Sequence, residues 1–141
     1  MSNHVDVIDS ALARFRETAI PPTGWSYAAA EAIRWLNHAT IDPGGYIYPA
    51  DVYSAIGELQ TLLQRLPQAL NQAAVALEAM DDAGHVVDVE RADRTAVSVL
   101  TVTESLAYAA SHCETAAREL ASAQIPAGRL AYRQHPEAGE R

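Results

Sequence analysis

The chain has 141 residues, a single cysteine and a formal net charge of −8. This length suits one domain, the lone cysteine excludes an internal disulfide, and the negative field disfavours nucleic acid and anionic membrane surfaces as partners. The N-terminal stretch MSNHVDVIDSALARF lacks the basic start and apolar run of a signal peptide, and no stretch has the roughly 18 apolar residues of a membrane span. We therefore expect a cytoplasmic protein.

Two short helices are expected in the first 40 residues. The first is predicted over 3–19, where apolar residues recur at spacings of three and four. They are Val5, Ile8, Leu12, Phe15 and Ala19. The stretch IPPTG ends this helix, because consecutive prolines remove N–H donors and favour extended backbone. A second helix is expected over 25–40, with Thr23 or Ser26 as its N-cap.

The third predicted helix spans 49–82 and carries a long apolar pattern. Its apolar residues, spaced alternately by four and three, are Val52, Ile56, Leu59, Leu63, Leu66, Leu70, Ala73, Leu77 and Met80. Pro67 lies in the middle, and a proline inside a helix costs about 3 kcal/mol. The register passes through Pro67 unchanged, which favours one proline-kinked helix. The alternative is two abutting helices, with Pro67 in the first turn of the second. Gly84 is expected to end the element.

The fourth predicted helix spans 88–123, with Asp88 as its N-cap and the stretch IPAG after its end. It keeps the same spacing of three and four throughout. Its inner positions are Val89, Ala92, Ala96, Val99, Thr103, Leu106, Ala110, Cys113, Ala117 and Leu120.

These elements predict an all-α protein. The third and fourth helices should each be about 50 Å long, and the short DAGHVV connection makes them antiparallel. We therefore expect a three- or four-helix bundle built on a long antiparallel helical hairpin, with a proline-kinked third helix. Residues 1–126 would form a single domain, and 127–141 a polar, flexible tail. The first two helices are about half as long as the hairpin, so they either cover one half of it or stack end to end along it. If they cover only half, an apolar strip is left at the other end that a second copy would cover.

Side chains that could carry chemistry are scattered along the chain. His85 lies among carboxylates in MDDAGHVVDVE, but the spacing of helical metal sites is missing, which favours a capped and solvated helix–helix turn. His112 and Cys113 are adjacent on one helix and point in different directions, which favours a buried structural thiol over a nucleophile pair. We therefore assign no catalytic residue, no metal ligand and no cofactor.

The stretch RWLNHA places Arg34 and His38 four residues apart on one helical face. Their order resembles the Arg…His motif of HEPN nucleases, which are also small helical bundles. That motif usually has four to six residues between the two, whereas three intervene here. Arg129 and His135 have five between them but lie in the expected tail. A HEPN-like ribonuclease is the remote alternative.

Six of the nine aromatic residues lie between Trp25 and Tyr53. Tyr46 and Tyr48 alternate around Ile47 in extended backbone, so they point the same way. Trp35, Tyr46, Tyr48 and Tyr53 are expected to cluster at one end of the bundle. Such a cluster is either a lid on the core, which we favour, or a surface for a partner or ligand.

A pattern runs through residues 46–133. It consists of YPADVYSAIGELQTLLQRLPQAL, an Ala-rich helix later in the chain, and AGRLAY close to the end. This pattern resembles a group of small Ala-rich helical proteins of actinobacteria, of uncharacterised role and often encoded near plasmid or integrated-element genes. The resemblance implies a helical fold and an accessory or mobile-element context, and it transfers no active site.

The leading hypothesis is a non-enzymatic interaction protein: an adaptor, accessory factor or regulator that binds a protein partner and associates with itself as a homodimer. The alternative is a small-ligand binding module with an aromatic pocket formed by Trp35, Tyr46, Tyr48 and Tyr53. Neither nucleic acid nor a membrane is expected as a partner.

Overall fold

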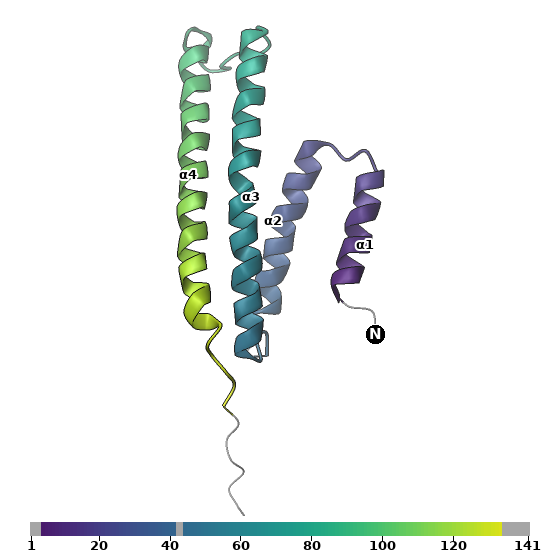
Figure 1. The fold of residues 1–141 in the computed structure, drawn as a ribbon. Helices are drawn as coiled ribbons and strands as arrows, with labels where there is room; N and C mark the ends of the chain where they lie inside the picture. The colour runs from purple at the N-terminus through teal and green to yellow at the C-terminus, as the bar shows by residue number, and fades with distance from the viewer. Residues whose placement is uncertain (1–3, 42–43, 134–141) are drawn as a thin grey trace, which may run out of the picture. The chain divides into compact units, whose positions relative to one another are not determined.

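The computed structural model describes residues 4–41 and 44–133, and every regular element in them is helical (Figure 1). The elements are α1 (His4–Glu17), α2 (Pro22–Ala39), α3 (Pro49–Asp82), the short 3-10 helix η1 (Ala92–Arg94) and α4 (Thr95–Ala127). The predicted all-α fold is confirmed. The chain divides into an N-terminal unit, residues 1–47, and a hairpin unit, residues 48–141. None of the described helices combines the length and the hydropathy that crossing a bilayer requires.

The N-terminal unit contains α1, α2 and the turn after α2. Helix α2 begins three residues earlier than predicted, because Pro22 occupies its first turn, where a missing N–H breaks no helical hydrogen bond. Pro21 is the N-cap, with φ −64° and ψ 155°, so the assignment of Thr23 or Ser26 as N-cap is wrong. Among the residues that the structure describes, α1 and α2 show no close packing against each other.

The turn after α2 depends on Gly45. Thr40 closes the helix, since its backbone N–H and its hydroxyl both donate to the Leu36 carbonyl, at 3.1 and 2.9 Å. A Cβ added at Gly45 would lie 2.5 Å from the Thr40 Cα and 2.7 Å from the Ala39 carbonyl oxygen. Only glycine therefore lets the chain return this close to the helix end. The Asp-Pro pair predicted to start this turn, residues 42–43, lies outside the described residues.

Helix α3 is one continuous helix of 34 residues with Pro67 inside it, as predicted. Pro49 occupies its first turn, and the Tyr48 backbone N–H donates to the Asp51 carboxylate at 2.9 Å, which is half of a capping box. After the helix, Gly84 takes a left-handed φ of +72°, a conformation that ends helices and favours glycine. Pro67 has no N–H to donate to the carbonyl one turn back, so helix continuity here rests on packing.

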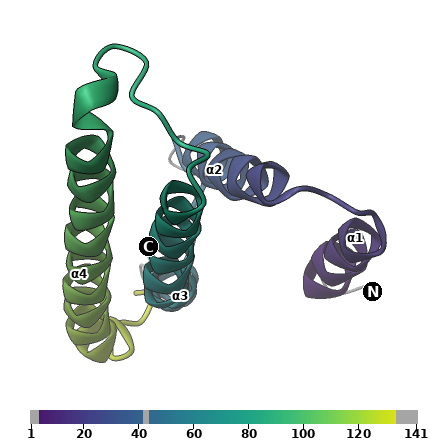
Figure 2. The same cartoon turned by 90° about the horizontal axis from the view of Figure 1, so that it is seen from above.

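Helices α3 and α4 lie side by side and antiparallel (Figures 1 and 2). Between them runs a seam of buried and half-buried side chains at alternating spacings of three and four. On α3 the seam consists of Ile56, Gln60, Leu63, Pro67, Leu70, Ala74, Leu77 and Asp81. On α4 it consists of Val99, Thr103, Leu106, Ala110, Cys113, Ala117, Leu120 and Gln124. Small residues at a helix contact favour the short end of the usual 8–10 Å spacing between helix axes.

The seam is rotated on α3 relative to the prediction. Ile56, Leu63, Leu70 and Leu77 lie in it as expected, but Pro67 rather than Leu66 takes the central place. The predicted inner positions outside the seam are Val52, Leu59, Leu66, Ala73 and Met80. Leu59 and Leu66 are half-buried, and the other three are exposed.

Helix α4 starts at Thr95, seven residues after the predicted start, and η1 precedes it (Figure 2). Asp88 is therefore not its N-cap. The predicted inner positions before the helix and in its first turn are exposed: Val89, Ala92 and Ala96. From Val99 to Leu120 the predicted positions are buried or half-buried, as expected. At its other end the helix continues through Pro126 to Ala127, past the predicted end at 123.

Candidate interaction surfaces

Two of the predicted aromatic site residues, Trp35 and Tyr46, belong to the N-terminal unit. Trp35 is 63% exposed; the Arg34 guanidinium lies 4.7 Å from the centroid of its ring, and the centroid of the His38 ring lies 6.0 Å away. Tyr46 is 38% exposed. Arg34 also donates from Nε to the Glu31 carboxylate at 2.9 Å. The guanidinium of the RWLNHA stretch is thus held by its own helix, between a carboxylate and an aromatic ring.

The other two, Tyr48 and Tyr53, belong to the hairpin unit and lie at its open end, where α3 begins and α4 ends. The Tyr48 ring meets the Tyr132 ring edge-on, with centroids 5.5 Å apart. The Tyr53 ring lies against Gly128, where an added Cβ would come within 3.2 Å of it. The segment after α4 is therefore fastened to the start of α3 by aromatic contacts. Tyr132 is not among the predicted site residues, although it lies in the stretch AGRLAY.

The four predicted site residues fall in both units, two in each. Their gathering into one cluster, as a lid or as a ligand pocket, stays a prediction. Tyr48 has Tyr132 as its ring partner inside the hairpin unit. The contact between Tyr48 and Tyr132 is a packing contact within the hairpin unit. It holds the residue just before α3 without involving Trp35.

The histidines and the cysteine lie apart from one another. Cys113 is half-buried in the seam, and the neighbouring His112 is exposed, which agrees with the prediction that the two side chains point in different directions. His85 follows α3, and its backbone N–H donates to the Met80 carbonyl at 2.9 Å, which closes the helix end. Across residues 4–41 and 44–133, no three His, Cys, Asp or Glu side chains are grouped so as to hold a metal ion.

Asp88 organises the closed end of the hairpin, between α3 and α4. Its Oδ1 accepts the backbone N–H groups of Glu90 and Arg91, both at 3.0 Å, and its Oδ2 accepts the Ser98 hydroxyl at 2.5 Å. Its own N–H donates to the Thr95 hydroxyl at 3.0 Å. The Ser98 hydroxyl, followed by the Arg91 and Glu90 N–H groups, holds the pKa of the Asp88 carboxyl below its ordinary value. The carboxylate ties the loop to the first turns of α4.

The two sides of the hairpin differ in chemistry. On one side, which we call the polar flank, a groove beside Pro67 is lined by polar and small residues of both helices. They are Gln60, Gln64, Pro67, Glu114, Ala117, Arg118 and Ala121. Along each helix of an antiparallel pair, the side chains that border the seam on one side form a row, and successive members of the row are seven residues apart. The α3 row therefore contains Gly57, Gln64, Asn71 and Glu78.

The rows on the opposite side contain only apolar residues from 52 to 80 on α3 and from 102 to 123 on α4, and we call this stretch the apolar flank. It consists of Val52, Leu59, Leu66, Ala73 and Met80 of α3 and Val102, Ala109, Ala116 and Ala123 of α4. Met80 and Val102 are 51% and 46% exposed. Within the described part of the hairpin unit, no further helix packs on α3, and only the short η1 contacts α4. The sequence had marked the α3 row correctly as apolar, but as part of the seam.

Comparisons of the chain with protein-family models, with curated proteins and with solved structures gave no match.

Proposed function

We propose that this chain is a non-enzymatic interaction protein that associates with itself through the hairpin unit. The apolar flank is the observation that carries the proposal. Its leucine, methionine and valine side chains lie beside the seam, and burying a side chain of this size contributes about 1.5–3 kcal/mol. A second protein surface on this flank would supply that burial.

The seam of the hairpin supports the same proposal. Its buried residues are small, namely Pro67, Val99, Thr103, Ala110 and Ala117, and among the described residues no side chain is less than 2% exposed. A two-helix seam of this composition buries little apolar area, and Ala-rich helices gain most of their stability from tertiary packing. An adaptor or accessory role is the function that binding of a protein surface would serve. The net negative charge of the chain favours protein partners over nucleic acid.

Light scattering coupled to size exclusion tests self-association on the full chain. We expect the molar mass to rise with concentration, from that of one chain toward that of two, over the micromolar range. A mass that stays at one chain up to several hundred micromolar would contradict the proposal. Neutral pH and moderate salt are the appropriate conditions, because low salt would exaggerate repulsion between chains of net charge −8.

A further inference from the structure

Resting on the proposed self-association, we propose that two copies pair through their apolar flanks in an antiparallel, two-fold arrangement, so that two hairpins form one four-helix core. The closed end of each hairpin then lies beside the open end of the other. The proposal names the occupant of the flank as a second copy of this chain, and it fixes the direction in which that copy lies.

Length favours a second hairpin as the occupant. The apolar flank extends along α3 from Val52 to Met80, which corresponds to about 42 Å of helix. Helices α1 and α2 have 14 and 18 residues, or about 21 and 27 Å. Neither one alone matches the flank, whereas an identical hairpin matches it from end to end. A two-fold axis also places the same patch on both copies, which is how most homodimers are built.

The chemistry of the flank suits pairing with itself. Its rows contain no charged and no hydrogen-bonding side chain, so closing the interface would leave no side-chain donor or acceptor unpaired. In an antiparallel pair the α3 rows of the two copies meet with Leu66 at the centre and Leu59 of one copy against Ala73 of the other. Large side chains of one copy can therefore lie against small ones of the other, as packed helix bundles require.

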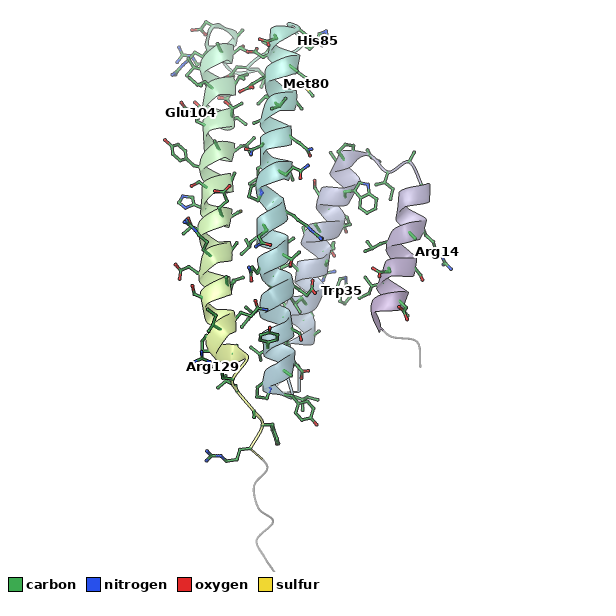
Figure 3. All side chains as sticks on the ribbon, viewed as in Figure 1. Arg14, Trp35, Met80, His85, Glu104 and Arg129 are labelled. Carbon is green, nitrogen blue, oxygen red and sulfur yellow. The ribbon has the colours of Figure 1, made fainter. Side chains whose placement is uncertain are left out.

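Charge decides the direction. The closed half of the hairpin, residues 67–110, carries seven carboxylates and two arginines, a net charge of −5. The open half, residues 48–66 and 111–133, carries four of each and is neutral. Figure 3 shows Glu104 toward the closed end and Arg129 at the open end. Parallel pairing would bring two acidic halves together, whereas antiparallel pairing sets each acidic half beside a neutral half that carries arginines.

Disulfide trapping between two positions at opposite ends of the flank tests the direction. Val52→Cys and Met80→Cys are prepared separately in full chains that also carry Cys113→Ser, then mixed and oxidised. Antiparallel pairing places residue 52 of one copy near residue 80 of the other, so the mixed disulfide should be the main product by mass spectrometry. A predominant Met80→Cys homodisulfide, or no crosslink in a sample that scatters as a dimer, would overturn the arrangement while leaving self-association standing.

A pair of charge substitutions tests the surface. Leu66→Glu, on the apolar flank, should raise the dimer dissociation constant about a hundredfold or more, because the carboxylate appears twice in the interface. Gln64→Glu adds the same charge two residues away on the polar flank and should change the dimer dissociation constant less than about threefold. Circular dichroism of both variants checks that the helices persist. Equal effects of the two would overturn the assignment of the flank, and a wild-type chain that is monomeric throughout would overturn self-association itself.

Discussion

The two units use the same kind of apolar spacing and reach different degrees of packing. In the hairpin unit, spacings of three and four on α3 and α4 meet in a seam where Ala110 and Ala117 are only 6% and 5% exposed. On α1, Ile8 and Leu12 have the same spacing but are 60% and 46% exposed, and the described part of α1 shows no packing on α2. Periodicity specifies a helix and its inner face. Packing requires a neighbour of matching length with side chains small enough to admit it.

The largest expected effect comes from breaking the seam. Ala110→Glu would place an unpaired carboxylate among buried residues of α3 and α4, and we expect it to lower the free energy of unfolding by about 3 kcal/mol or more. Urea denaturation followed by circular dichroism measures the change. Ser111→Glu, on the adjacent exposed position, is the matched control and should stay within about 0.5 kcal/mol of the wild type. Equal urea midpoints for the two variants would show that the seam is not closed at Ala110.

A smaller effect is expected in the N-terminal unit at the turn after α2. Gly45→Ala forces a Cβ against the backbone of Thr40 and Ala39, so we expect a loss of about 1–2 kcal/mol in local stability. Amide hydrogen exchange at the last turn of α2 measures it. Gly44→Ala is the control, because an added Cβ there meets nothing within 4 Å. If the amide hydrogens of the last turn of α2 exchange at the same rate in both glycine variants, the chain does not return to the helix end at Gly45.

The smallest expected effect concerns the closed end of the hairpin and depends on pH. Because the pKa of Asp88 is lowered in the folded chain, its carboxylate stabilises the fold above the unfolded-state pKa, near 4. This contribution disappears as the pH falls through the lower, folded-state pKa. Asp88→Asn should therefore have a lower urea midpoint than the wild type at pH 6, and the gap should close toward pH 2. The exposed Asp93→Asn is the control and should show little difference at either pH. A gap for Asp88→Asn that persists at pH 2 would assign its effect to shape rather than charge.

The sequence predicted α3 to the residue, because Pro49 and Gly84 are specific signals for a helix start and a helix end. It placed the start of α2 too late, because Pro21 and Pro22 were interpreted as breakers although proline is favoured in a first turn. It placed the start of α4 too early, because Asp88 is a good N-cap by type. In the structure the Asp88 carboxylate instead accepts hydrogen bonds from the loop and from the hydroxyl of Ser98, which lies one helical turn into α4.

The candidate surface was only partly predictable. The row from Val52 to Met80 was recognised as apolar, but α3 has a wide apolar arc, and hydrophobicity alone does not say which side of that arc meets α4. In the structure the side of α3 that contains Pro67, rather than Leu66, meets the alanines and Thr103 of α4. The contact between Tyr48 and Tyr132 joins residues far apart in the chain, so no local pattern could have indicated it.

The position of Cys113 has a kinetic consequence. It is the only thiol of the chain, and it is half-buried in the seam where α4 faces α3. A thiol reacts through its thiolate and only when a reagent can reach it. The ratio of the alkylation rates of Cys113 in the unfolded and the native chain therefore measures how strongly the seam protects it, without any introduced label. Any partner that clamps the hairpin shut would slow alkylation of the native chain, so one native side chain reports both the protection of the seam and the capture of the hairpin.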